Sequence, residues 1–259
     1  MRMTTVLKTE GLTKRFGGLM AINHVHFELK EGEIKALIGP NGAGKTTFYN
    51  LITGVYKPDS GKVLFMGEDI TRLPPNEICK KGIARTFQVT SIFPKLTVFE
   101  NVRLAAQVGF GGGVSAFKDI SRIKEVTDRV DQILEIVGLM DQRNRISMEI
   151  SQGDQRLQEV AMALGSNPKV LLLDEPTAGL SAKETDYLVE KVKDLFKNSM
   201  IKNIVLVEHD IEVVTGLAHT ICVLNYGEVI KDGPVDEVCN DPNVQEVYLV
   251  GGKVNVIAG

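Results

Sequence analysis

The chain has 259 residues, of which 43% are hydrophobic and 24% charged, and its formal net charge is −3. This is the composition of an ordinary globular protein, and the length suffices for one large or two modest domains with a proper core. A slightly acidic balance argues against nucleic acid as a partner, since a nucleic-acid binder carries a basic stripe. The three cysteines are widely spaced and form no CxxC pair, which indicates reduced, packed thiols rather than a metal site or a disulfide framework.

Membrane and export signals are weak in this sequence. The N-terminal segment contains no apolar signal-peptide core. No apolar run approaches the roughly 20 residues that a membrane span requires. We therefore expect a cytoplasmic protein that is not itself a channel but is able to dock onto one.

Strand and helix patterns alternate along most of the chain. In the first part, short apolar or alternating runs predict strands at residues 6–9, 25–29, 34–38 and 62–65, and a helix at 45–53. The middle part is helical, with helices predicted at residues 98–108 and 118–137 on either side of a glycine-rich break. Strands then return at residues 170–174, 204–208, 220–225 and 228–232, with helices at 182–198 and 211–217.

The helix predicted at residues 118–137 has a clear apolar stripe. Its apolar positions recur at spacings of three and four: Ile120, Ile123, Val126, Val130, Ile133, Leu134 and Val137. Such a stripe favours a face packed on the core, and a partner-binding helix is the alternative.

Residues 39–46 (GPNGAGKT) match the phosphate-loop pattern GxxxxGK[ST] between a predicted strand and a predicted helix. Glycines let backbone N–H groups surround phosphates, and the helix N-terminus adds a favourable dipole. Lys45 is suited to reach the β- and γ-phosphates, and the Thr46 hydroxyl suits Mg²⁺. A glycine-rich turn without a ligand is the alternative. The candidate nucleotide-binding residues here are Gly39, Pro40, Asn41, Gly42, Ala43, Gly44, Lys45, Thr46 and Thr47.

Two adjacent carboxylates, Asp174 and Glu175, end the most apolar predicted strand. Because parallel strands end at one edge of the sheet, Asp174 is expected beside the phosphate loop, where it would hold Mg²⁺. Glu175 is a candidate general base for the attacking water. An acidic pair bound to a helix N-terminus is the alternative.

These features predict an α/β fold: a phosphate-loop NTPase core with a mostly parallel sheet, an N-terminal antiparallel β subdomain and an inserted α-helical lobe. We expect a single nucleotide-binding domain over residues 1–259. Residues 1–88 and 165–259 would form the catalytic core lobe, and residues 89–164 the helical lobe.

The order and spacing of GPNGAGKT, Gln88, SQGDQ, LLLDEP and His209 resemble an ABC transporter ATP-binding subunit over nearly the whole chain. The resemblance implies that Phe16 stacks on adenine, with a packed core phenylalanine as the alternative. It also implies that Gln88 contacts Mg²⁺ and water, and that His209 hydrogen-bonds the γ-phosphate. The other three histidines match nothing in the family and are expected to be structural: His24, His26 and His219.

The same resemblance assigns Ser151 and Gly153 to a signature loop, which binds the γ-phosphate of an ATP held by the neighbouring subunit. This chain departs from the family pattern near that loop. Gln152 takes a variable position, Asp154 brings a carboxylate near the other subunit's triphosphate, Ser181 replaces a frequent Asp, and Met162 replaces a frequent Arg. No departure removes a catalytic group, but together they would slow turnover or weaken dimerisation.

The family implies ATP/ADP and Mg²⁺ as ligands, and an ATPase that powers transport by head-to-tail dimerisation. The expected partners are a second copy or a paralogous ATPase, integral membrane permease subunits and, indirectly, a solute-binding protein, with the chain peripheral on the inner face of the cell membrane. GIARTFQ, the glycine-rich break and VQEVYLVGG resemble the branched-chain amino acid importer ATPase.

Several other functions remain open at this stage. Related subunits import urea or small amides, or export lipopolysaccharide. A soluble DNA-repair ATPase would have a long coiled coil, a translation-factor ATPase would have two cassettes, and a non-hydrolysing sensor would lack Glu175.

Overall fold

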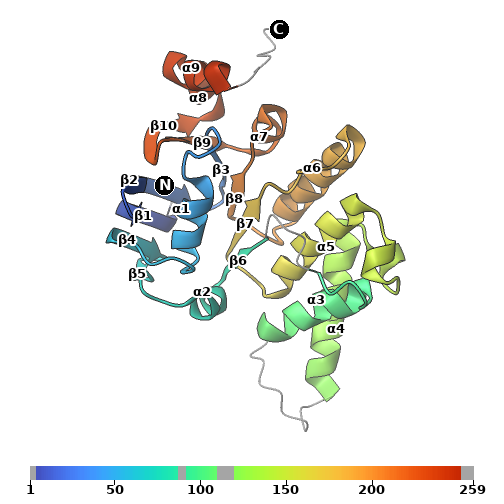
Figure 1. The fold of residues 1–259 in the computed structure, drawn as a ribbon. Coiled ribbons are helices and arrows are strands. Elements are labelled where there is room, and N and C mark those ends of the chain that lie inside the picture. The colour runs from blue at the N-terminus through green and yellow to red at the C-terminus, as the bar shows by residue number, and fades with distance from the viewer. Residues whose placement is uncertain (1–3, 87–91, 110–119, 252–259) are drawn as a thin grey trace. The chain divides into compact units, whose positions relative to one another are not determined.

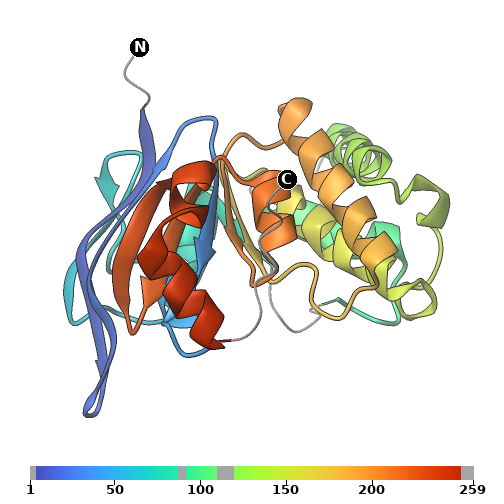
Figure 2. The ribbon, with the colours of Figure 1, turned by 90° about the horizontal axis from the view of Figure 1, so that it is seen from above.

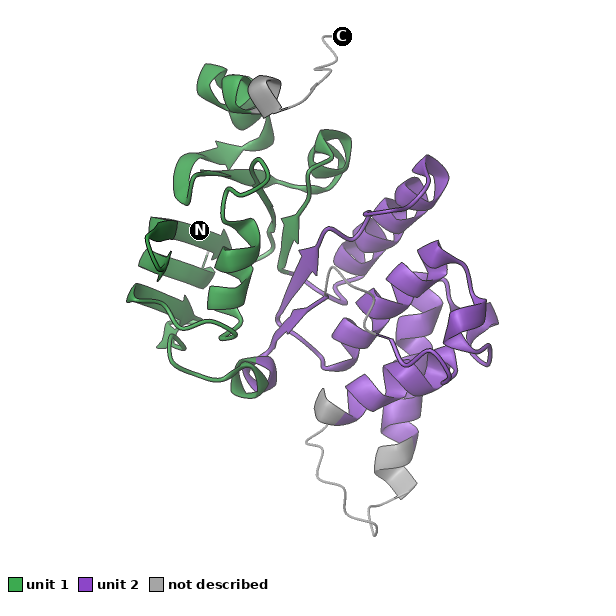
Figure 3. Ribbon diagram, in the orientation of Figure 1, with its two compact units in different colours: residues 1–78, 203–259 green, residues 79–202 purple. Residues whose placement is uncertain are grey.

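The computed structural model describes residues 4–86, 92–109 and 120–251, and the chain divides into two compact units (Figure 3). The first unit comprises residues 1–78 and 203–259, and the second comprises residues 79–202. Within the described ranges, every helix is too short or too polar to cross a membrane.

An antiparallel sheet forms the N-terminal part of the first unit. Its strand order is β2-β1-β4-β5, and the strands are β1 (Thr5–Phe16), β2 (Leu19–Lys30), β4 (Ser60–Phe65) and β5 (Glu68–Asp69). β1 and β2 form a long hairpin, drawn in blue in Figure 2, which closes through a Gly17-Gly18 turn between Phe16 and Leu19. The sequence predicted only residues 6–9 of β1, 25–29 of β2 and 62–65 of β4, and it did not predict β5, because the rest of these strands is held by backbone pairing rather than marked by an apolar pattern.

The first unit also contains four strands in the order β10-β9-β3-β8. They are β3 (Ile34–Ile38), β8 (Ile204–Val207), β9 (Thr220–Asn225) and β10 (Glu228–Pro234). β3 is parallel to both β8 and β9, and β10 pairs antiparallel with β9. The predicted parallel arrangement and the predicted antiparallel subdomain are therefore confirmed.

Helices supply the rest of the first unit (Figure 1): α1 (Lys45–Ile52), α7 (Ile211–Leu217), α8 (Val235–Cys239) and α9 (Pro242–Gly251). Val214 of α7, Val238 of α8 and Val244 of α9 pack with Ala36 and Ile38 of β3 in one buried cluster. This cluster holds β3, and with it the loop that follows β3.

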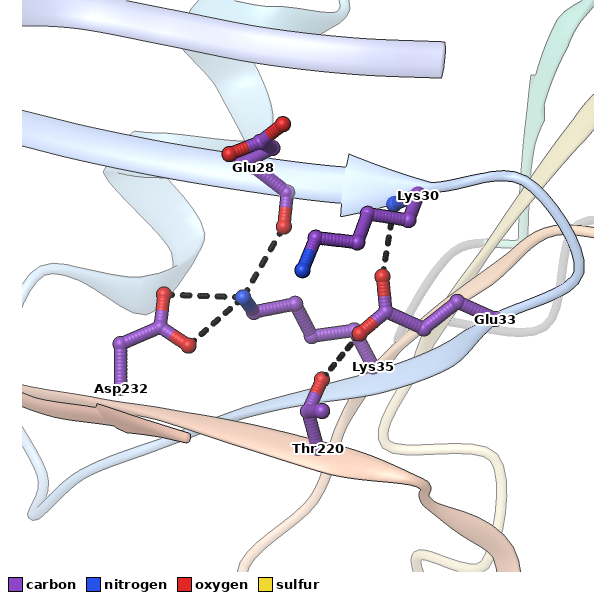
Figure 4. A network of polar contacts seen from close by, with 6 residues as sticks. All are labelled: Glu28, Lys30, Glu33, Lys35, Thr220 and Asp232. Atoms are coloured by element: carbon purple, nitrogen blue, oxygen red, sulfur yellow. Dashed lines mark hydrogen bonds and ion pairs between the residues drawn. The ribbon is translucent and has the colours of Figure 1, made fainter. Parts of the chain in front are cut away.

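A buried polar network crosses the first unit (Figure 4). Lys35 of β3 is buried, and its Nζ donates hydrogen bonds to the backbone oxygen of Glu28 (2.9 Å) and to both carboxylate oxygens of Asp232 in β10 (2.7 and 2.8 Å). Glu33 accepts from the backbone N–H of Lys30 (2.6 Å) and from the Thr220 hydroxyl. Burial raises the pKa of Asp232, and the Lys35 ammonium opposes that shift. The network ties β2, β3, β9 and β10 together through polar groups.

In the second unit a short parallel pair supports four helices. β6 (Ile83–Arg85) pairs with β7 (Val170–Asp174), and α2 (Pro75–Lys81) lies where the first unit gives way to the second. The helices are α3 (Val98–Gly109), α4 (Ile120–Val137), α5 (Gln152–Gly165) and α6 (Ala182–Lys197), with short 3₁₀ turns at Met140–Gln142 and Ser147–Glu149.

The predicted apolar stripe is the core face of α4. Five of its positions are buried: Val126, Val130, Ile133, Leu134 and Val137. α4 contacts α3, α5 and α6, and α3 approaches α5 so closely at Gly165 that a Cβ atom there would lie 2.9 Å from Ala106 N. The core-facing interpretation of the stripe is confirmed for the described side chains.

Candidate nucleotide-binding site

The phosphate loop follows β3 directly and ends where α1 begins (Figure 1). Lys45 is buried, and its Nζ donates hydrogen bonds to the backbone oxygens of Gly39 (2.6 Å) and Pro40 (3.1 Å). The Ala43 N–H also donates to Pro40 O (3.1 Å), which closes the turn. The ammonium group is thus held against its own loop, while Asn41, Gly42 and Thr46 are exposed.

Two glycines of the loop are required by close backbone approaches. A Cβ atom on Gly39 would lie 2.2 Å from Leu224 O, and one on Gly44, whose φ is 107°, would lie 2.6 Å from Ala21 O. Gly44 is the N-cap of α1 and provides no side-chain acceptor, and the first turn of α1 holds no acidic residue. A helix N-terminus built in this way favours an external anion over a side-chain cap.

Phe16 lies at the end of β1 and is 42% exposed. Its ring meets the Tyr56 ring edge-on, with centroids 5.3 Å apart, and the Lys14 ammonium lies 5.6 Å from its centroid. The ring is therefore not a packed core side chain, and it has a surface on which a base can stack.

His209, which follows β8, and His219, which precedes β9, differ in surroundings. The His209 side chain is 63% exposed, and its Nδ1 lies 3.8 Å from Oε2 of the fully buried Glu208. By contrast, the Ile34 N–H donates to His219 Nδ1 (2.9 Å), and the His219 N–H donates to Ile34 O (2.8 Å). His219 is structural as predicted, whereas His209 presents an accessible imidazole.

In the second unit, Asp174 ends β7 as a buried carboxylate. Arg85 Nη2 of β6 lies 2.6 Å from Asp174 Oδ2, with both side chains less than a tenth exposed. The Asp174 N–H donates to Thr86 Oγ1 (3.2 Å), and the Thr86 N–H donates to Leu172 O (2.9 Å). Backbone and side chain of Asp174 are thereby both fixed by the neighbouring strand.

Glu175 adopts a left-handed backbone conformation, with φ at 47°. Such a conformation costs a residue with a Cβ about 1–2 kcal/mol, and residues of this kind concentrate at functional sites. The bend after β7 is closed by a hydrogen bond from the Ala178 N–H to Glu175 O (3.1 Å). Glu175 shares a positive φ with five other described non-glycine residues, and it is the one that follows the buried strand β7 directly.

The residues of the predicted signature loop begin α5. Ser151 is the N-cap, and its Oγ accepts from the Asp154 N–H (3.1 Å). Gly153 is buried in the first turn, against Glu184 of α6. Ser181 is the N-cap of α6, where it forms a reciprocal capping box with Glu184.

The two units therefore each hold part of the predicted residue set. The first contains the phosphate loop, Phe16 and His209, and the second contains Asp174, Glu175 and the signature loop. Gln88 lies outside the described residues.

Sequence reasoning missed Arg85 and Glu184. Ser181-Ala-Lys-Glu184 is the S-x-x-E pattern of a capping box and was a usable signal, whereas β6 is too short to show a period that would have placed Arg85.

A phosphate loop between a strand and a helix, together with an acidic pair ending a buried strand, defines a phosphate-loop nucleotide-binding protein. The sequence profile of the ABC transporter family matches residues 22–178. The chain belongs to the ABC transporter family and is an ATP-binding, ATP-hydrolysing subunit.

Individual relatives agree with this assignment. The high-affinity branched-chain amino acid transport ATP-binding protein LivG of Escherichia coli (strain K12) is 40% identical over 249 residues, covering 94% of this chain and 97% of LivG. The protein of the same description from Pseudomonas aeruginosa, BraF, is 37% identical, with 94% of this chain and 97% of BraF covered.

Solved structures show the same fold. The ADP conformation of MJ1267, an ATP-binding cassette of an ABC transporter, matches with a TM-score of 0.81 and 30% identity over 95% of this chain and 98% of that one. A dimeric post-hydrolysis state of the ATP-binding cassette MJ0796, bound to ADP and Pi, matches with a TM-score of 0.74 and 29% identity over 88% of this chain and 98% of that one.

Proposed function

We propose that this chain powers the import of branched-chain amino acids by hydrolysing ATP on the cytoplasmic face of the membrane. The substrate class rests on relatives that are 37–40% identical over 94% of the chain and carry that transport description. The observation that carries the nucleotide site is the buried Lys45 ammonium, held against its own loop at the start of an uncapped helix.

The proposed nucleotide-binding residues of the first unit have separate roles. Lys45 and the loop N–H groups bind phosphate, Phe16 stacks on adenine, and His209 hydrogen-bonds the γ-phosphate. Its exposed imidazole suits that task, since a side chain that meets a ligand cannot be enclosed by protein. Residues 1–88 and 165–259 would act as the catalytic core lobe, and residues 89–164 as the helical lobe.

The oxygen donors present suit Mg²⁺, which prefers hydroxyl, carboxylate and phosphate oxygens. We propose that Thr46, Asp174 and Gln88 hold the ion. Thr46 is exposed at the start of α1, and Asp174 is a buried carboxylate oriented by Arg85 and Thr86. Bound Mg²⁺ would neutralise charge on the β- and γ-phosphates.

Glu175 is proposed as the general base. Its carboxylate would take a proton from water as the water attacks the γ-phosphate, and its strained backbone would hold that carboxylate in place.

ATP would join two subunits head to tail, with Ser151 and Gly153 of each subunit facing the γ-phosphate held by the other. The dimeric structure of the similar cassette MJ0796 bound to ADP and Pi supports dimerisation. The second subunit would be another copy or a paralogous ATPase. The dimer would act on integral membrane permease subunits, which receive solute from a binding protein, through Gln88 and the residues that follow it.

The decisive test is Glu175→Gln, which keeps the side chain's size and backbone but removes the base. ATP hydrolysis measured by phosphate release should fall below about a thousandth of the parent rate, because the attacking water loses its proton acceptor. ATP binding measured by calorimetry should persist, and light scattering should show an ATP-dependent dimer.

The matched control is Glu190→Gln, on the exposed face of α6, where the side chain is 65% exposed. It should leave hydrolysis unchanged. Normal turnover in Glu175→Gln would remove Glu175 from the role of base.

A further inference from the structure

Glu184 makes two kinds of contact, and the first belongs to its own helix. Its Oε2 accepts from the Ser181 N–H (3.0 Å) and the Ser181 hydroxyl (2.7 Å), and its own N–H donates to Ser181 Oγ (3.4 Å). These bonds close the capping box of α6, which satisfies first-turn N–H groups without any help from α5.

The second contact reaches a different helix. The Glu184 carboxylate also lies against Gly153 in the first turn of α5, and the Gly153 N–H contributes to lowering the pKa of Glu184. A Cβ atom on Gly153 would lie 3.1 Å from Glu184 Cγ and 3.2 Å from Oε1, so only a glycine leaves this carboxylate its place without displacement. The bonds from Ser181, and after them the Gly153 N–H, lower the pKa of Glu184. The carboxylate thus sits as an anion at the N-termini of two helices, a position that helix dipoles favour.

The Gly153 N–H is also the group that the proposed dimer requires for the partner's γ-phosphate. One N–H cannot donate fully to two anions, and a carboxylate and a γ-phosphate at one helix N-terminus repel each other. The Ser181 bonds use Oε2, whereas Oε1 is the carboxylate oxygen nearest the position of a Cβ on Gly153, so Oε1 is able to leave Gly153 while Oε2 keeps α6 capped.

We infer that Glu184 is a displaceable anion which occupies the signature-helix N-terminus when no partner nucleotide is there, and which therefore opposes ATP-driven dimerisation. This inference rests on the head-to-tail dimer proposed above. The Glu184 carboxylate must leave Gly153 on dimerisation. Breaking this contact in each subunit raises the ATP concentration at which the dimer closes.

The chain provides a matched control for this inference. Glu100 forms a capping box of the same kind at α3, accepting from the Thr97 N–H (2.8 Å) and the Thr97 hydroxyl (2.9 Å). Glu100 and Glu184 lie in the same unit and both have a lowered pKa from their capping bonds. Of the two carboxylates, Glu184 is the one whose pKa is lowered in part by an N–H group of the signature loop.

The experiment places each substitution in the Glu175→Gln parent and measures the ATP concentration at half-maximal dimer by light scattering. Glu184→Ala should lower that concentration about three- to tenfold, the equivalent of one modest hydrogen bond. Glu100→Ala should leave it unchanged, although both variants should melt at similarly reduced temperatures. Glu184→Gln retains a capping box without the charge. It should also lower the ATP concentration at half-maximal dimer, because the negative charge beside Gly153 is gone.

An unchanged concentration in Glu184→Ala overturns the inference, and a raised one shows that Glu184 positions the signature loop instead of occupying it. If the parent itself fails to dimerise with ATP, the proposed function fails first. In that case NMR of the unsubstituted chain still decides the contact: the Gly153 amide shift should titrate with Glu184, and a shift independent of pH overturns the inference.

Discussion

At the scale of single residues, Lys45, which we propose binds phosphate, has its charge held within its own loop. Its ammonium is buried in the loop and bonds two backbone oxygens, Gly39 O and Pro40 O. Lys45→Ala should therefore raise the ATP dissociation constant at least about a hundredfold, since it removes the charge that meets the phosphates. Calorimetric titration with ATP measures this change.

Lys57→Ala is the matched control for that prediction. Lys57 also donates to two backbone oxygens, Arg72 O (2.9 Å) and Leu73 O (2.8 Å), but from an exposed position away from the phosphate loop. It should bind ATP normally. An unchanged ATP affinity in Lys45→Ala contradicts the phosphate-loop assignment.

Arg85 is the second residue with a specific expected effect. Its loss leaves the Asp174 carboxylate buried without its guanidinium partner, and breaking a buried pair in this way costs about 3 kcal/mol. Arg85→Ala should lower the free energy of unfolding by that amount in urea titration. Lys8→Ala breaks the exposed Lys8–Glu10 pair and should change stability much less, because water screens that pair. Equal effects of the two substitutions would show that Asp174 does not depend on Arg85.

How far residues were predictable depended on whether their pattern was local. Lys45 and Asp174 lie in short motifs next to a strand, so the sequence placed both at the right strand end. The partner of Asp174 is 89 positions away, and no local pattern links Arg85 to it. Ser181 was interpreted only as a departure from the family, although its hydroxyl caps α6.

At the scale of elements, the Lys35 network holds β10 to β3 by way of a buried ammonium. Asp232→Asn should lower the free energy of unfolding by about 2 kcal/mol, because Lys35 loses its charged partner while remaining buried. This expected loss of unfolding free energy is smaller than that for a fully buried ion pair, because the Asp232 side chain is 33% exposed. Urea unfolding measures it.

Glu10→Gln provides the comparison, since the Lys8–Glu10 pair lies at the surface, with side chains 43% and 41% exposed. Its effect on the free energy of unfolding should be much smaller, because water screens an exposed pair. A similarly small effect of Asp232→Asn would mean that the network contributes little to stability.

Elements were predictable where periodicity was strong. The strand Val170–Asp174 and the helix Ile211–Leu217 begin and end where the sequence predicted. α2, β6, α8 and α9 were not predicted, since most are short and their apolar positions are too few to show a period. The three residues of β6 become a strand only by pairing with β7.

At the scale of the whole molecule, acid should destabilise the fold. Hydrogen bonds and neighbouring cations hold several carboxyl pKa values below their ordinary 4.5 or 3.8: Glu10, Asp59, Asp69, Glu100, Glu184 and Asp241. The unfolded chain then binds protons more readily than the folded chain, so the stability is present above the ordinary values and is lost as pH falls through the lowered ones. The raised pKa of Asp232 acts in the opposite direction, but it is one group against several.

The melting temperature should accordingly fall between about pH 5 and about pH 3. A double variant, Glu100→Gln with Glu184→Gln, should show a shallower fall, because two of the carboxylates no longer titrate. Calorimetry across that range measures both slopes. A melting temperature that stays constant or rises on acidification would contradict this sign.

The turn between β9 and β10 has a consequence for how the protein is made. The Gly227 N–H donates to Ala43 O (2.9 Å), the Asn23 N–H donates to Gly227 O (2.8 Å), and Leu224 O lies where a side chain on Gly39 would be. The sequence of the phosphate loop is complete once residue 46 has been synthesised. The turn between β9 and β10, whose backbone contacts the loop, is synthesised about 180 residues later. Such a long-range contact forms late. A growing chain thus carries the whole motif for most of its synthesis before the backbone that supports the loop exists, and a chain truncated before β9 would keep the motif without that support.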